Sequence, residues 1–150
     1  MSREIIIADA SCLIVLQNIQ GLSLLQKLFD EVFITQEVAK EFGVNLPEWV
    51  KVKLIQNKAQ QNALNLVLDK GEASSIALCL ETDDSLLIID ERKGRRIAQE
   101  LGIKISGTLG VILRAKEKGL INSVENILDK LEKAGFWISP NLKAKILEKV

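Results

Sequence analysis

The sequence predicts an α/β fold, a three-layer α/β/α sandwich around a mainly parallel sheet of four to five strands. Short β-branched apolar runs alternate with longer stretches of helical spacing, which is typical of strands covered by helices on both faces. A length of 150 residues with 47% hydrophobic content suits one ordinary globular domain. Because no repeat, low-complexity segment or linker divides the chain, we expect a single domain over residues 1–150.

In the first half of the chain, punctuating residues separate the expected elements. Gly21 breaks one helix, and Pro47 marks a turn before a half-exposed edge strand in which valines alternate with lysines. Thr35 is placed to cap a helix that Gly43 stops. The expected elements are strand 4–8, helix 10–20, helix 22–29, strand 31–35, helix 36–42, edge strand 50–54 and helix 58–68.

Capping patterns mark the helices of the second half. Asp69 and Glu72 have the spacing of a capping box at the start of a helix. Ser139 and Pro140 supply a serine cap and a proline at the first helical position of the last helix. The expected elements are helix 72–80, strand 86–89, helix 91–102, strand 103–106, helix 108–119 and two closing helices, 122–133 and 139–150.

The composition excludes several chemistries because histidine is absent. Ser-His-Asp hydrolysis, His-paired cysteine attack and histidine acid–base ribonuclease chemistry all need that side chain. Carboxylates without His or clustered Cys favour Mg²⁺ or Mn²⁺ over zinc. Cys12 and Cys79 lie within apolar sequence, which predicts two small core residues in a reducing compartment.

The sequence offers no membrane anchor and no strong overall charge. No apolar run approaches the roughly 18 residues of a membrane span, and the first apolar stretch contains an acid where a signal peptide needs none, so we expect a cytoplasmic protein. Basic and acidic residues balance at 20 each, so nucleic-acid binding must come from local patches. The clearest patch consists of Arg92, Lys93, Arg95 and Arg96.

The basic patch and the tryptophans each allow two interpretations. The patch either contacts phosphates or forms a solvated helix face with Arg96 and Glu100 paired. Trp49 and Trp137 could stack on bases, but with so few aromatic residues the sequence favours packing.

Acidic residues gather where the strands of a parallel sheet end, which is the edge at which such folds bind ligands. Asp9 and Asp90 follow strands directly, Glu37 and Glu41 lie on the helix after strand 31–35, and Glu72 opens a helix. Each acid alone could be a helix cap or a solvated charge. Together at one edge they would repel by about 3 kcal/mol per close pair unless a cation lies among them.

Several segments together resemble PIN-domain proteins, and most of all a subfamily related to VapC-type toxins. The similarity covers nearly the whole chain and rests on the order and spacing of the motifs. They are IIIADAS (5–11), EVAKE (37–41), GEASSIAL (71–78), LLIIDERKGRR (86–96), GTLGVILRAK (107–116) and AGFWISP (134–140).

The resemblance implies a nuclease fold with strand 4–8 at the centre of the sheet and three or four acids that bind one or two divalent ions. The implied ligands, which are also the catalytic residues, are Asp9 supported by Ser11, then Glu41, Glu72 and Asp90. Glu72 stands where many PIN proteins carry Asp. The common Thr-x-Asp is here Ile88-Ile89-Asp90-Glu91, so Asp90 and Glu91 compete for the fourth place.

The resemblance also implies a function. A Mg²⁺- or Mn²⁺-dependent endoribonuclease is expected, with RNA as substrate, the role of a toxin, a small antitoxin protein as partner and a homodimeric state. The alternative is a catalytically silent PIN-like module that binds RNA or protein. A phosphoacceptor or nucleotide-binding domain is disfavoured, because no G-x-G-x-x-G or Walker lysine motif is present and Asp9-Ala10-Ser11 lacks the second acid of an Asp-x-Asp phosphatase.

Overall fold

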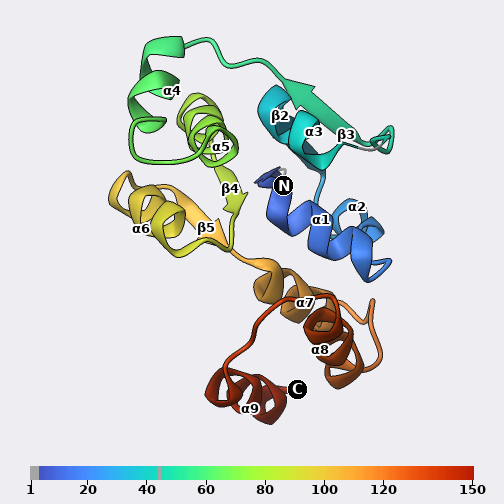
Figure 1. Ribbon diagram of the computed structural model, residues 1–150. Helices are drawn as coiled ribbons and strands as arrows, with labels where there is room; N and C mark the ends of the chain where they lie inside the picture. Colours follow the sequence, from blue (N-terminus) through green and yellow to red (C-terminus); the bar gives the residue numbers. More distant parts are fainter. Residues whose placement is uncertain (1–3, 44) are drawn as a thin grey trace.

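The computed structural model describes residues 4–43 and 45–150 and contains one parallel sheet (Figure 1). The strand order is β3-β2-β1-β4-β5, with β1 at the centre and every neighbouring pair parallel. The five strands are β1 (Ile5–Ala8), β2 (Glu31–Thr35), β3 (Val50–Lys53), β4 (Ser85–Ile88) and β5 (Lys104–Ser106). The predicted parallel α/β sheet of four to five strands is therefore confirmed.

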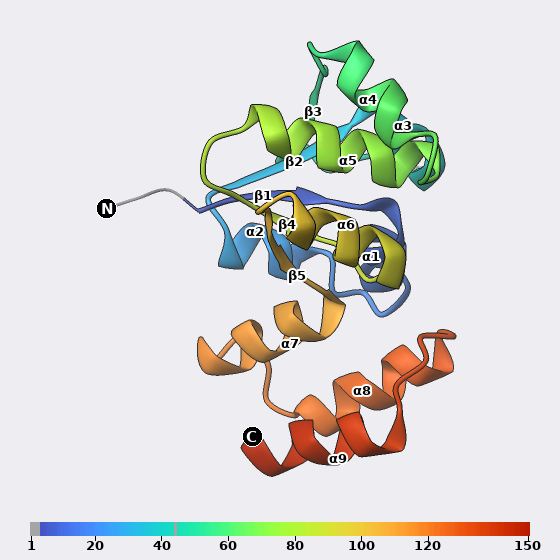
Figure 2. The ribbon, with the colours of Figure 1, turned by 90° about the vertical axis from the view of Figure 1, so that its left-hand side faces the viewer.

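Helices cover both faces of the sheet, as Figures 1 and 2 show. The larger core includes side chains of α1, α2, α3, α7 and α8, and the smaller core on the other face includes side chains of α5 and α6. The helices are α1 (Ala10–Asn18), α2 (Ser23–Leu28), α3 (Gln36–Phe42), α4 (Lys58–Leu64), α5 (Lys70–Glu81), α6 (Arg92–Glu100), α7 (Thr108–Glu117), α8 (Val124–Lys133) and α9 (Pro140–Lys149).

Strand β1 is apolar at every position because its two faces are buried in different cores. Ile6 and Ala8 belong to the larger core, whereas Ile7 belongs to the smaller one, and all three are fully buried. Successive side chains of a strand point to opposite faces, so a central strand of a sheet covered on both sides has no polar face. Burial of one such isoleucine stabilises the fold by about 1.5–3 kcal/mol.

The expected caps are present at three helix starts. Thr35 Oγ1 accepts from the backbone N–H of Val38 at 3.1 Å, and Asp69 Oδ1 accepts from that of Glu72 at 2.8 Å. Ser139 Oγ accepts from the N–H of Leu142 at 3.1 Å. These caps fix where α3, α5 and α9 begin, and therefore which residues face the edge of the sheet.

Other expectations are confirmed or corrected locally. The helix expected over 58–68 ends at Leu64, where the chain turns. Cys12 and Cys79 are free and buried as predicted, and burial raises the pKa of both thiols to about 12, so they stay protonated. Among the described residues, no helix has the length and apolar character that crossing a membrane requires.

Candidate functional site

Three carboxylates converge on the start of α5. A Cβ built on Gly71 would lie 2.9 Å from Oε1 of Glu41 and 3.7 Å from Oδ1 of both Asp9 and Asp69. These acids come from three places: the end of β1, the last turns of α3 and the N-cap of α5. The missing side chain at Gly71 leaves the space in which they meet.

Burial and like charge raise the pKa values of Asp9, Glu41 and Glu72. Asp9 is 3% exposed, and burial together with the charges of Glu41 and Asp69 raises its pKa to about 6. Burial, followed by the charge of Asp69, raises the pKa of Glu41. Glu72 is 8% exposed, and burial together with the charges of Asp69, Glu91 and Asp9 raises its pKa to about 8. We call Asp9, Glu41, Asp69, Glu72 and Glu91 the acidic group.

Capping does not account for Asp9. The residue stands at the N-cap of α1, yet its side chain makes no capping hydrogen bond. Its Oδ2 instead accepts from the hydroxyl of Ser11 at 3.1 Å. Ser11 therefore lies where it can orient Asp9, the supporting position that the sequence suggested for it.

Asp90 and Glu91 point to different neighbours. Asp90 accepts from the backbone N–H of Thr108 at 2.8 Å and from its hydroxyl at 2.5 Å, so it holds the start of α7. Glu91 caps α6 by accepting from the N–H groups of Lys93 and Gly94 at 3.0 and 2.7 Å. The cap of this helix is thus Glu91, and the interpretation of Asp90 as its cap was wrong. Of the two, Glu91 is the one whose charge raises the pKa of Glu72.

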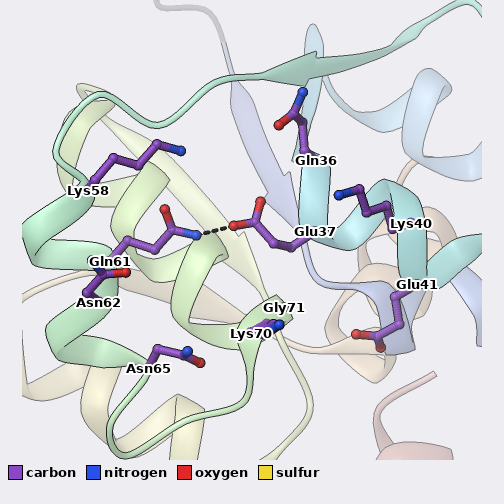
Figure 3. Close-up of a pocket in the computed structure, with 10 residues that line it drawn as sticks. All are labelled: Gln36, Glu37, Lys40, Glu41, Lys58, Gln61, Asn62, Asn65, Lys70 and Gly71. Atoms are coloured by element: carbon purple, nitrogen blue, oxygen red, sulfur yellow. Dashed lines mark hydrogen bonds between the residues drawn. The ribbon is translucent and has the colours of Figure 1, made fainter.

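Glu37 and Glu41 also have different surroundings. Glu37 accepts a hydrogen bond from the amide of Gln61 across a polar pocket of about 560 Å³, whereas Glu41 lies one turn further along α3 (Figure 3). This pocket adjoins the acidic group, because Glu41 belongs to that group and also lines the pocket, as does Gly71. It is lined by Gln36, Glu37, Lys40, Glu41, Lys58, Gln61, Asn62, Asn65, Lys70 and Gly71.

The basic patch does not act as one surface. Arg95 is half-buried, and its Nη1 donates to the carbonyl of Ile89 at 2.7 Å, which ties α6 to the end of β4. Arg92, Lys93 and Arg96 are exposed and free to meet a ligand. The described residues show no ion pair between Arg96 and Glu100, so that part of the solvated-face interpretation was wrong.

The two tryptophans behave differently. Trp49 is half-buried and packs against the larger core, in agreement with the sequence. Trp137 is 79% exposed, so the prediction that it packs was wrong. Its sequence neighbours Phe136 and Ile138 pack in the larger core, whereas the indole of Trp137 does not.

The donor set fits a divalent cation in its chemistry. The acidic group offers carboxylate oxygens alone, the ligands that Mg²⁺ and Mn²⁺ prefer, and its mutual repulsion is what a cation relieves. As the side chains stand, no group of three or more His, Cys, Asp and Glu among the described residues could hold a metal ion. Ligation would therefore require side-chain rotations that bring the carboxylates closer together.

Sequence reasoning gave Asp69 only a capping role. The structure places Asp69 beside Gly71, where its charge raises the pKa of Asp9, Glu41 and Glu72. No local pattern in the sequence distinguishes Asp69 from an ordinary N-cap, because its neighbours Asp9 and Glu41 come from distant segments.

The fold and the site together define a parallel α/β/α protein with acids collected at the carboxyl edge of its sheet. This chain belongs to the PIN-domain family: a family model described as a PIN domain matches residues 5–150. PIN domains are generally nucleases and typically use divalent metals. No match was found among curated proteins or among solved structures.

Proposed function

We propose that the protein is a Mg²⁺- or Mn²⁺-dependent endoribonuclease that hydrolyses phosphodiester bonds of RNA at the acidic group. The observation that carries the proposal is the convergence of Asp9, Glu41 and Asp69 on the space at Gly71, at the carboxyl edge of a PIN-domain sheet. A bound divalent ion would hold a phosphate oxygen, activate a water molecule and stabilise the leaving oxygen.

The residues of the chain have separate tasks in this proposal. Asp9, Glu41 and Glu72 would hold the ion, with Asp69 and Glu91 adding negative charge around it. The hydroxyl of Ser11 would keep Asp9 oriented. Because the pKa values of Asp9 and Glu72 are raised to about 6 and about 8, protons must leave as the ion binds. Metal affinity should therefore rise with pH up to about 8.

The fourth acid of the resemblance, Asp90, has a different task. Its two hydrogen bonds to Thr108 fix the start of α7 next to the acidic group. We therefore place Glu91, ahead of Asp90, among the residues that act on the ion, and we give Asp90 a positioning role.

The polar pocket beside Glu41 would receive the RNA. Lys40, Lys58 and Lys70 bring positive charge for phosphates, and the amides of Asn62 and Asn65 can both donate to and accept from bases. The exposed Arg92, Lys93 and Arg96 add further phosphate contacts on α6. Single-stranded RNA is the expected substrate, because its bases can leave the stack to enter such a pocket.

Cleavage of a mixed-sequence single-stranded RNA tests the proposal. Cleavage should require Mg²⁺ or Mn²⁺ and stop with EDTA, and zinc should support it no better than Mn²⁺ does. The variant Glu72→Gln should lose the activity in the same assay, which excludes a contaminating nuclease. Full activity in EDTA, or no cleavage with either ion, would refute the proposal.

A silent PIN-like module is the second candidate. It is favoured by the arrangement of the acids, since no group among the described residues could hold a metal as it stands. Such a module would bind RNA or protein, yet neither Mg²⁺ nor Mn²⁺ would produce cleavage. Mn²⁺ titration of the wild type and of Asp9→Asn separates the two candidates, because the silent module should show no Mn²⁺ binding that is lost in the variant.

The biological setting is also a proposal. The resemblance of the sequence to VapC-type toxins suggests the toxin of a toxin–antitoxin pair, acting as a homodimer in the cytoplasm and held inactive by a small antitoxin protein. A short neighbouring gene whose product co-purifies with this protein and stops cleavage would support that setting. The absence of any such gene would argue against it.

A further inference from the structure

A second groove, of about 680 Å³, begins at Asp90 and lies away from the polar pocket. Its lining residues come from β5 and α7 and from the chain between Phe136 and Lys149, together with Asp90 and Arg95. None of its lining residues is shared with the polar pocket, so it requires its own explanation.

The outward position of Trp137 is fixed by its neighbours. Phe136 packs against the larger core and Ile138 is buried, so the backbone is held on both sides of Trp137. The indole is nevertheless 79% exposed and lines the groove. Because tryptophan is highly buried on average, packing does not account for an indole that is this exposed and lines a groove.

Positive charge accompanies the indole. Lys145 and Lys149 are one turn apart on α9, are exposed, and both line the groove together with Arg95 of α6. No ion pair among the described residues involves these three cations. The only acid in the lining, Asp90, already accepts two hydrogen bonds from Thr108.

We propose that this groove binds single-stranded RNA, with a base stacked on Trp137 and phosphates held by Lys145 and Lys149. Stacking on an aromatic ring flanked by cations is how sequence-tolerant single-strand binding is built. An apolar protein partner would instead cover two lysines without offering a counter-charge. The inference rests on the proposed function, because Asp90 is next to Glu91 of the acidic group and the groove would carry the strand away from the cleavage site.

Equilibrium binding in EDTA tests the groove without cleavage. In a Trp49→Phe variant, Trp137 is the remaining tryptophan, and an RNA on the order of 12 nucleotides should quench its fluorescence on binding. Anisotropy of the same RNA, labelled with a dye, measures affinity in the wild-type background. Trp137→Ala should weaken binding about 10-fold, and Trp137→Phe should restore most of that loss because a phenyl ring still stacks.

Salt dependence tests the lysines. Replacing Lys145 and Lys149 together with Gln should reduce the slope of log affinity against log salt by about 1.4, which is roughly 0.7 for each lost phosphate contact. Lys118→Gln is the control, because Lys118 is exposed after α7 and does not line the groove. It should leave the slope unchanged.

The groove proposal and the nuclease proposal can be refuted independently of each other. RNA that binds with unchanged Trp137 emission, and with equal affinity for wild type and Trp137→Ala, would overturn the groove proposal even if the protein cleaves RNA. A groove reserved for a protein partner would give that same result. Quenching with the expected losses in the variants would uphold the groove even if no metal produced cleavage.

Discussion

Removing the charge of Glu72 should stabilise the protein when no metal is bound. Glu72→Gln keeps the size of the side chain and the backbone N–H that Asp69 caps. In the wild type, burial and the charges of its acidic neighbours raise the pKa of Glu72 from 4.5 to about 8. The folded state therefore holds this proton more tightly than the unfolded state does.

The sign of the pH dependence follows from that difference. Stability from Glu72 is fully present below pH 4.5 and is lost as the pH rises to about 8. One pKa unit corresponds to about 1.36 kcal/mol, so the raised pKa of Glu72 lowers the free energy of unfolding at pH 8 by more than that of an ordinary glutamate. Part of that energy belongs to Asp69, Glu91 and Asp9, whose charges act on Glu72. We therefore expect the single substitution to raise the free energy of unfolding by about 2 kcal/mol.

Thermal melts in EDTA measure the effect. For a domain of this size, about 2 kcal/mol corresponds to a melting temperature that is about 4–8 °C higher for Glu72→Gln at pH 8, with little difference at pH 4.5. Glu117→Gln is the control, because Glu117 is exposed in the last turn of α7, and it should shift stability by no more than about 0.5 kcal/mol. An unchanged or lower melting temperature for Glu72→Gln at pH 8 would show that Glu72 does not repel its neighbours.

Three further experiments with substituted proteins test how the site is assigned. Gly71→Ala places a Cβ 2.9 Å from Glu41 Oε1. The substitution should therefore lower cleavage about 10- to 100-fold in an RNA assay without lowering the melting temperature. A lower melting temperature with normal cleavage would contradict the role of this space. Glu41→Gln should lower cleavage by orders of magnitude, whereas Glu37→Gln should stay near wild type, and the reverse ranking would exchange their roles. Glu91→Gln should weaken Mn²⁺ binding by about 10-fold, measured by calorimetric titration, and more than Asp90→Asn does; equal or opposite losses would return Asp90 to the ligand set.

The order of the elements was determined by the sequence itself. Hydrophobic period and caps act over a few residues, so β1, β4 and the starts of α3, α5 and α9 could be predicted from local patterns. A parallel sheet then places the ends of its strands at one edge whatever the loops do. For this reason the positions of Asp9 and Glu41 at that edge could be expected in advance.

The fine geometry of the site could be decided only by the tertiary structure. Which acids face the other carboxylates depends on where distant segments pack. Thr108 donates hydrogen bonds to Asp90, and Gln61 donates one to Glu37. Asp69 could not be told from an ordinary cap, because its closeness to Asp9 arises from contacts far apart in the chain.

Trp137 shows the same limit for burial. Its sequence neighbours are apolar on both sides, which is typical of core residues, yet Phe136 and Ile138 pack into the larger core while the indole of Trp137 is 79% exposed. Local sequence records what a side chain prefers, whereas its neighbours in space decide whether that preference is met. The long-range contacts that bring those neighbours together exist only once the sheet and its helices have packed.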